Sequence, residues 1–302
     1  MQNISIIANP VAGGGKGKAR AEAMEKALIA RGLSVDLFLT EKAGDAEAHA
    51  ATLECDVVVS VGGDGTANEV INGLGDKQIA LAILPMGSAN VVARELQLPK
   101  DPEALAELIM DKRIRFMDVG SRNGRRFLLG AGAGLDAAIT HQVQTMRGKK
   151  SSVWRWVIPA IKTILGYTYP KIRVTVAGRV ITETAEYAIV GNCKYSAGIF
   201  SATPRSKLDD GFLDVCLVHD LNPWRLICMA VLIWFPGFVD RDNIIYVKGK
   251  EILFEPAGEE SVLLQVDGDP AGELPMHFSV LPRALPVVTP RGTGPASPPK
   301  VV

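Results

Sequence analysis

The stretch Asp56–Asn72, DVVVSVGGDGTANEVIN, decides the fold predicted for this chain. Its apolar or small residues Val57–Val61 are typical of a buried strand. Gly62-Gly63-Asp64-Gly65 then interrupt the run as a tight turn. Thr66 is predicted to begin a helix, because Thr66-x-x-Glu69 has the spacing of a capping box. The order is therefore strand, glycine-rich turn and helix.

This order suits phosphate binding. Backbone N–H groups without a neighbouring Cβ can approach a phosphate, and the N-terminus of a helix favours its negative charge. Asp64 adds a carboxylate that suits Mg²⁺ bridging phosphate oxygens. The alternative interpretation is a glycine-rich turn that binds nothing.

Strands and helices alternate on both sides of this stretch. The predicted strands are Ile4–Ala8, Ser34–Leu39 and Ile79–Leu84, and the predicted helices are Ala19–Ala30, Asp45–Glu54, Val91–Gln97 and Pro102–Met110. Such alternation predicts an open, mostly parallel sheet. The polar or glycine-rich residues Asn9–Gly17, Thr40 and Pro85–Asn90 follow strand ends, where ligands of α/β sheets bind.

The pattern changes after about Arg115, where strands begin to dominate. The predicted strands are Phe116–Val119, Arg126–Gly130, Ile172–Val176, Val180–Val190, Phe212–Val218, Ile244–Val247, Glu251–Phe254, Val262–Val266 and His277–Leu281, with a helix at Leu135–Gln144. They predict a β-rich, sandwich-like domain. We expect an α/β domain over residues 1–118, joined by a returning strand within 283–290, a second domain over 119–282, and a disordered tail over 291–302.

Composition excludes one class of partner. The chain has 302 residues, and its 33 Lys and Arg residues balance 33 Asp and Glu residues. The chain therefore lacks the net positive charge that is typical of nucleic-acid-binding proteins. The four cysteines lie far apart in mostly apolar surroundings, which is typical of reduced thiols in a cytoplasmic protein.

Two apolar segments, Val153–Tyr169 and Trp224–Val239, contain all four tryptophans. Charged residues or proline interrupt both, so neither has the roughly 18 continuous apolar residues expected of a membrane-spanning helix. Tryptophan and tyrosine beside Lys and Arg suit a surface that enters a bilayer interface. Helices packed on the sheet, or a contact between two copies in a homodimer, are the alternatives.

Two acidic motifs complete the pattern. Lys207-Leu208-Asp209-Asp210-Gly211-Phe212 precedes a predicted strand, and Asp267-Gly268-Asp269 follows one. Either could be a simple turn, since Asp-Gly is also a hairpin signal. A kinase, however, needs a base for the acceptor hydroxyl and carboxylates that organise Mg²⁺.

Taken in order, these motifs resemble one family. They are Asn9-Pro10…Gly13, Thr40, Gly62-Gly63-Asp64-Gly65-Thr66-x-Asn68-Glu69, Pro85-x-Gly87-Ser88-x-Asn90, Asp118-x-Gly120, Lys207-Leu208-Asp209-Asp210-Gly211 and Asp267-Gly268-Asp269. The chain resembles bacterial soluble lipid kinases of the diacylglycerol kinase catalytic-domain family, in the superfamily of sphingosine and ceramide kinases. The resemblance covers about residues 4–290 and implies an α/β domain, like that of NAD kinase and diacylglycerol kinase, plus a β-rich domain.

The resemblance also implies a site. ATP contacts would come from Asn9, Pro10, Gly13, Thr40, Gly62, Gly63, Asp64, Gly65, Thr66, Asn68 and Ser88. Mg²⁺ would lie near Lys207, Asp210 and Phe212, the first and last through main-chain carbonyls, with Asp64 and Asp118 as further members of the metal network.

The chain departs from the family pattern at three positions. The Glu of the family's Asp-Gly-Glu motif, which contains the catalytic base, is Asp269 here, so the base is either Asp267 or Asp269. Ser88 replaces a threonine, and Val91 replaces an aspartate of the usual metal network. Metal binding is therefore expected to be weaker or arranged differently.

These observations favour an ATP-dependent, Mg²⁺-dependent lipid kinase acting on diacylglycerol or a related lipid alcohol. We expect it in the cytoplasm, at the inner face of the membrane. A soluble-metabolite kinase similar to NAD kinase is one alternative, although the Asn9–Gly13 loop and the tryptophan-rich segments argue against it. A nucleotide-binding regulator without catalytic activity is the other, and the departures at Asp269 and Val91 permit it.

Overall fold

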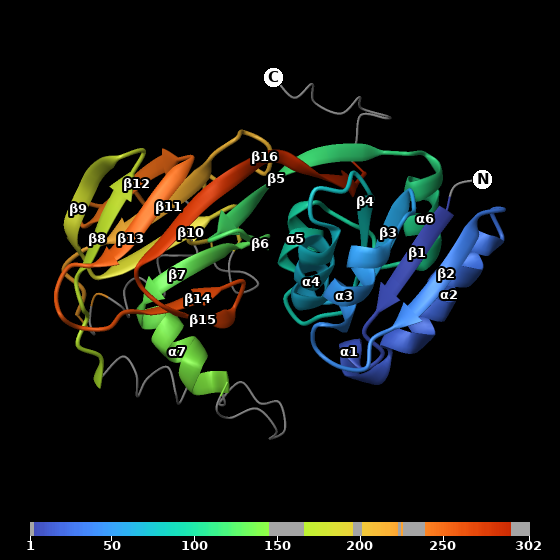
Figure 1. Cartoon of the computed structure of the whole chain (residues 1–302), viewed down its shortest axis with the longest axis horizontal. Coiled ribbons are helices and arrows are strands. Elements are labelled where there is room, and N and C mark those ends of the chain that lie inside the picture. The colour runs from blue at the N-terminus through green and yellow to red at the C-terminus, as the bar shows by residue number, and fades with distance from the viewer. Residues whose placement is uncertain (1–2, 145–165, 196–200, 223–224, 226–238, 291–302) are drawn as a thin grey trace. The chain divides into compact units, whose positions relative to one another are not determined.

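The computed structural model describes residues 3–144, 166–195, 201–222, 225 and 239–290. These residues belong to two compact units (Figure 1). Unit 1 consists of Met1–Val119, Leu208–Asp210 and Leu281–Val302, and unit 2 consists of Gly120–Lys207 and Gly211–Val280. Two strands, β5 (Ile114–Arg122) and β16 (Met276–Val288), have residues in both units.

Unit 1 is an α/β unit with a parallel sheet. Its remaining elements are β1 (Asn3–Ala8), α1 (Ala12–Gly15), α2 (Gly17–Ile29), β2 (Ser34–Leu39), α3 (Asp45–Thr52), β3 (Val57–Gly62), α4 (Asp64–Leu74), β4 (Ala80–Pro85), α5 (Val91–Glu95) and α6 (Pro102–Met110). The strands lie in the order β2-β1-β3-β4-β16, and each pair of neighbours is parallel. The predicted α/β fold class is confirmed.

Burial explains why the strands of this sheet are apolar throughout. Every residue of β3 and β4 is buried, which is typical of central parallel strands covered on both faces. Met24 and Leu28 of α2 and Leu105 and Ile109 of α6 pack in the same apolar core as these strands. The returning end of β16 completes the sheet, with Val287 opposite Leu81.

Unit 2 is a sandwich of two sheets. Its elements are β6 (Arg125–Phe127), β7 (Gly130–Gly134), α7 (Leu135–Gln144), β8 (Ile172–Val176), β9 (Arg179–Ala185), β10 (Tyr187–Gly191), β11 (Leu213–Val218), β12 (Ile244–Gly249), β13 (Glu251–Pro256), β14 (Leu263–Val266) and β15 (Asp269–Glu273). One sheet has the order β16-β13-β8-β9 and the other β12-β11-β10-β7-β14-β15, all with antiparallel neighbours. Phe254 and Phe278 of one sheet share an apolar core with Val190 and Leu217 of the other, which confirms the β-rich prediction.

Several predicted element boundaries are wrong. Helix α4 begins at Asp64 rather than Thr66, and its N-cap is Gly63 with no side-chain cap, so the predicted capping box does not form. The loop after β1 contains the short helix α1, although Gly13 and Gly14 have positive φ values of 61° and 71°. The predicted strand His277–Leu281 and the predicted returning strand within 283–290 belong to the single strand β16.

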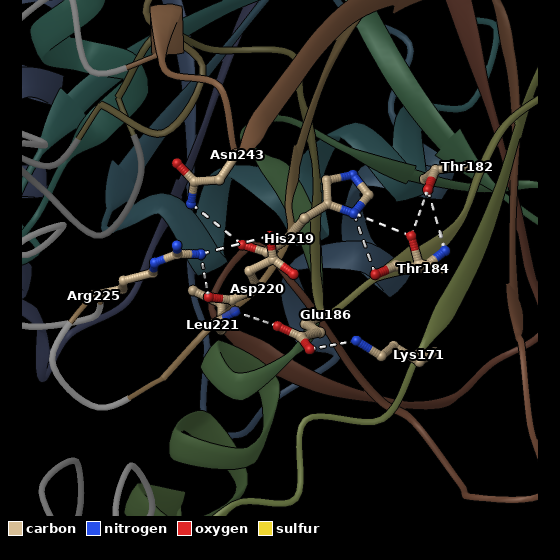
Figure 2. A network of polar contacts seen from close by, with 9 residues as sticks. All are labelled: Lys171, Thr182, Thr184, Glu186, His219, Asp220, Leu221, Arg225 and Asn243. Atoms are coloured by element: carbon tan, nitrogen blue, oxygen red, sulfur yellow. Dashed lines mark hydrogen bonds and ion pairs between the residues drawn. The ribbon is translucent and has the colours of Figure 1, made fainter.

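The predicted strand Val180–Val190 is two strands, because the chain changes sheet at Glu186. Strand β9 pairs with β8 in one sheet, and β10 pairs with β7 and β11 in the other. Glu186 is buried at this corner, and Figure 2 shows its contacts with Lys171 and Leu221. One of its carboxylate oxygens accepts a hydrogen bond from the Lys171 ammonium, and the other accepts one from the backbone N–H of Leu221.

The same network closes the connection between β11 and β12. The backbone N–H of His219 donates to the Asn243 carbonyl at 2.9 Å, and the Asn243 side chain donates back to the His219 carbonyl at 3.2 Å. Arg225 donates to the Asp220 carbonyl at 2.8 Å. Nearly all of the two tryptophan-rich segments, and the whole of the predicted tail, lie outside the described residues. Within the described residues, no helix combines the length and apolarity that a bilayer crossing requires.

We expect Glu186→Ala to destabilise unit 2 by about 2–4 kcal/mol, because it leaves a buried N–H and an ammonium without their acceptor. The matched control is Glu183→Ala on the neighbouring strand, where the ion pair with Arg173 is exposed. Removing that pair is expected to cost about 1 kcal/mol or less. Urea denaturation followed by circular dichroism measures both, and equal midpoints for the two variants would contradict the anchoring role of Glu186.

Candidate nucleotide-binding site and acidic turns

A cavity of about 560 Å³ lies beside the strand ends of unit 1. Predicted ATP-binding residues lie around it: Asn9, Pro10, Thr40, Gly63, Gly65 and Thr66. Its other lining residues are Val11, Ala12, Glu41, Lys42, Ala43, Ala46, Glu69 and Gly87. A cavity of this size is within the range of small-molecule and cofactor sites.

Hydrogen bonds between neighbouring strands bring the three loops of the site to one sheet edge. The backbone N–H of Asn9 donates to Val61 at 3.0 Å, and that of Thr40 donates to Ala8 at 2.9 Å. Met86 similarly donates to Gly62 at 2.7 Å. Each loop is therefore fixed where it leaves its strand, as the parallel-sheet interpretation requires.

The N-terminus of α4 faces this cavity with its first turn. Gly65 and Thr66 line the cavity, and no side chain caps the helix. The first N–H groups of a helix have no partner within the helix, so they can donate hydrogen bonds to an anion. The arrangement can therefore hold the phosphates of a nucleotide.

Asp64 connects the glycine-rich turn to helix α5. Its carboxylate accepts hydrogen bonds from the backbone N–H groups of Val91 at 3.1 Å and Val92 at 3.4 Å, and so caps α5. Burial raises the pKa of Asp64, and these hydrogen bonds lower it in part. Asp64 thereby joins the glycine-rich turn to the next loop, and its side chain is partly committed to that role.

Two glycines allow these loops to meet. A Cβ on Gly87 would lie 2.7 Å from the Cα of Gly63 and 2.9 Å from Oδ1 of Asn90. Asn90 itself folds back, accepting from the Gly87 N–H at 2.8 Å and donating to the Gly87 carbonyl at 2.6 Å. The Asn90 side chain therefore does not cap α5.

The remaining predicted ATP residues do not line the large cavity. A Cβ on Gly62 would lie 2.4 Å from Oγ1 of Thr66, so Gly62 provides space for that side chain. Gly13 lies against Met86, Asn68 accepts from Asn72 at 3.1 Å, and Ser88 lines a smaller cavity of about 230 Å³. Sequence reasoning missed Glu41, Lys42 and Ala43, although they directly follow Thr40 at the carboxyl end of a strand.

The two candidate bases in unit 2 have contrasting surroundings. Asp267 occupies a hairpin turn with positive φ, and its carboxylate accepts from the N–H groups of Leu128 and Leu129 at 2.9 Å and of Gly130 at 3.1 Å. Asp269 begins β15, and its side chain is exposed. Asp267 is thus committed to holding the hairpin, whereas Asp269 is accessible.

Leu208–Gly211 form a turn between the exposed residues Lys207 and Phe212, which together with Asp210 were predicted to hold metal. Asp209 pairs with Arg115 at 2.8 Å, while Asp210 is partly buried. The proposed donor set of two carbonyl oxygens and one carboxylate is hard, which fits Mg²⁺. Asp118 is buried, and its Oδ1 accepts from the Arg283 N–H at 2.7 Å, where β16 has positive φ. No group of three or more His, Cys, Asp or Glu side chains gathers among the described residues, so a metal would also need main-chain or substrate oxygens.

Comparisons with known proteins agree with this architecture. The model of the diacylglycerol kinase catalytic domain matches residues 3–122, and that of the YegS C-terminal NAD kinase beta sandwich-like domain matches residues 130–289. A diacylglycerol kinase from Staphylococcus haemolyticus is 28% identical over 95% of this chain and 88% of its own length. One from Staphylococcus saprophyticus is 29% identical over 94% of each chain.

A crystal structure of a provisionally assigned diacylglycerol kinase from Bacillus anthracis str. Sterne has the same fold. Its TM-score is 0.75 at 26% identity, with 95% of this chain and 96% of that chain covered. The two domain models together span nearly all of both units. The chain therefore belongs to the family of lipid kinases that join a diacylglycerol kinase catalytic domain to a YegS C-terminal NAD kinase beta sandwich-like domain.

Proposed function

We propose that the chain transfers the γ-phosphoryl group of ATP to the hydroxyl of diacylglycerol or a related lipid alcohol. The observation that carries this proposal is the cavity of about 560 Å³ against the uncapped N-terminus of α4. The names of the staphylococcal relatives support diacylglycerol as the acceptor. In the reaction, the acceptor oxygen bonds to the γ-phosphorus while the bond to the bridging oxygen breaks and ADP leaves.

The exposed carboxylate of Asp269 is proposed as the base that receives the proton of the lipid hydroxyl. Asp267 is less suited, because three backbone N–H groups already donate to its carboxylate. The lipid hydroxyl needs a proton acceptor that it can reach, and an exposed carboxylate on the hairpin meets that need. Because Asp269 is one methylene shorter than the family's Glu, the lipid hydroxyl must approach the backbone of this turn more closely.

ATP would bind with its phosphates toward the first turn of α4. Lys207, Asp210 and Phe212 are proposed to hold Mg²⁺, the first and last through their carbonyl oxygens. When bound, the ion would neutralise charge on the phosphate oxygens. Asp64 contributes by fixing the loop before α5, since its carboxylate accepts from that helix.

We further propose that the kinase lies in the cytoplasm and meets its lipid as a peripheral protein at the inner face of the membrane. Cys55, Cys193 and Cys216 form no disulfide among the described residues, which is compatible with that compartment. The tryptophan-rich segments 153–169 and 224–239 are the proposed contacts with the bilayer, and a homodimer through the same segments is the alternative.

The direct test is transfer of radiolabel from γ-labelled ATP with Mg²⁺ to diacylglycerol in mixed micelles. Ceramide, a sphingoid base and a total lipid extract are tested in parallel, and NAD is the soluble acceptor. A labelled lipid that disappears with Asp269→Asn is the expected result. Labelling of NAD without labelling of any lipid would overturn the proposal, as would ATP binding without any transfer.

We expect Asp269→Asn to lower kcat by about 10²-fold or more while the unfolding midpoint is unchanged, because an amide cannot receive the proton. Asp269→Glu should retain activity, since it restores the family's own residue. Asp267→Asn should instead lower the free energy of unfolding by about 1–3 kcal/mol, because one amide oxygen cannot satisfy three N–H donors. Kinetics and urea denaturation on the same preparations distinguish the two roles, and the opposite pattern would make Asp267 the base.

We expect Gly65→Ala to weaken nucleotide binding about tenfold without destabilising the fold. Gly65 lines the cavity, and beyond its chain neighbours and its own helix backbone a Cβ there would meet no protein atom within 4 Å, so the methyl group would enter open space. Alanine also favours a helix over glycine by about 1 kcal/mol. Gly258→Ala, equally free of steric conflict but far from the cavity in sequence, is the control. Titration with a fluorescent ATP analogue measures both, and unchanged affinity in Gly65→Ala would exclude this cavity as the nucleotide site.

A further inference from the structure

The hairpin that carries Asp269 has a second attachment besides Asp267. The backbone N–H of Gly268 donates to Oε1 of Gln265 at 3.0 Å, and Nε2 of Gln265 donates to Oδ2 of Asp136 at 2.9 Å. The oxygen of the Gln265 amide therefore faces a hydrogen-bond donor, and its nitrogen faces an acceptor. Its orientation is determined, because only the oxygen can accept from Gly268 and only the nitrogen can donate to a carboxylate.

Hydrogen bonds fix the side chain of Asp136 at the start of α7. Its Oδ1 accepts from the Ala137 N–H at 2.7 Å, and the Tyr187 hydroxyl is a further hydrogen-bond partner. Gly132 leaves space for the carboxylate, since a Cβ there would lie 2.0 Å from Oδ2 of Asp136. Gly132 is also the register partner of Gln265 between β7 and β14. Strand pairing and a missing side chain thus place the carboxylate against the amide.

We infer that Asp136 and Gln265 are positioning residues for Asp269. Asp267 fixes the first residue of the turn through its carboxylate, and Gln265 fixes the second through the Gly268 N–H. Together they set the direction in which the chain enters β15, whose first residue is Asp269. Neither Asp136 nor Gln265 is required to touch the substrate. The inference rests on the proposed function, in which Asp269 is the base.

The pKa of Asp136 is compatible with an ionised carboxylate that accepts hydrogen bonds at neutral pH. Burial is the main cause that raises the pKa of Asp136 to about 6, against the hydrogen bonds from Gln265, Ala137 and Tyr187. Burial and the charge of Asp136 raise the pKa of Tyr167 to about 12 and that of Tyr187 well above its usual value. Both phenols therefore stay neutral, and Glu260 and Tyr169 also act to raise the pKa of Tyr167.

The test exchanges the carboxylate and the amide between positions 136 and 265. Asp136→Asn places an amide against the amide of Gln265, and Gln265→Glu places a carboxylate against that of Asp136. In the double variant Asp136→Asn/Gln265→Glu, the carboxylate can accept from both Gly268 and the new amide. All assays are run at pH 8, so that the native Asp136 is ionised, with lipid phosphorylation as the readout. Gln78→Glu, at an exposed position, is the control for a change of net charge.

We expect each single variant to lower kcat about tenfold with the KM for ATP unchanged, because a small misplacement of a reacting group is costly. The double variant should recover to within about threefold of the native rate, by the logic of a double-mutant cycle. Gln265→Met removes both hydrogen bonds without adding charge, and it should match the single variants in kcat. Unfolding midpoints are measured for every variant, so that only folded proteins are compared.

Native kcat in the folded single variants and in Gln265→Met would overturn the inference, provided that Asp269→Asn is inactive. A folded double variant that stays as slow as the single variants would also overturn it. Full activity of Asp269→Asn would instead refute the proposed base, and absence of lipid phosphorylation by the native chain would refute the proposed function.

Discussion

The proposed nucleotide site depends on the close approach of two backbones, those of Gly63 and Gly87. No side chain separates them, and a Cβ on Gly87 would come within 2.7 Å of the opposite Cα. This approach brings the loop before α5 close enough for Asp64 to accept from Val91 and Val92. No side chain caps the first turn of α4, so its N–H groups are able to bind phosphate. The glycines thus allow the close approach because they have no side chain, and Asp64 connects the two loops by hydrogen bonds.

The Asp-Gly-Asp hairpin shows how environment divides roles between similar groups. Asp267 and Asp269 are the same residue type two positions apart, yet one carboxylate is surrounded by backbone donors and the other is exposed. A strand alternates its side chains between two faces, but a turn with positive φ lets neighbouring residues serve different partners. The chemistry proposed for this hairpin requires that division, because a group that holds the backbone cannot also move a proton freely.

Much of this was predictable from the sequence, and the misses have physical reasons. Alternating elements predicted the parallel sheet, since the apolar runs of β3 and β4 are typical of strands buried on both faces. The corner at Glu186 was missed because β-propensity continues through it, and only pairing partners reveal the change of sheet. The false capping box at Thr66 arose because spacing identifies donors and acceptors without showing where the helix begins. The bonds from Asp64 to α5 and from Gln265 to Asp136 join residues distant in sequence, so no local pattern predicts them.

The path of β16 has a consequence for the order in which the protein is made. Its last residues, including Val287 beside Leu81, complete the sheet of unit 1, and Thr289 donates there to the carbonyl of Arg113 at 2.9 Å. During synthesis, β4 of the first unit to leave the ribosome therefore lacks its β16 neighbour until the residues around Val287 have been translated. A nascent chain of this kind exposes an unpaired strand while unit 2 is still being formed. Truncated products that lack these residues of β16 would keep that exposed edge permanently, which makes them substrates for chaperones and proteases.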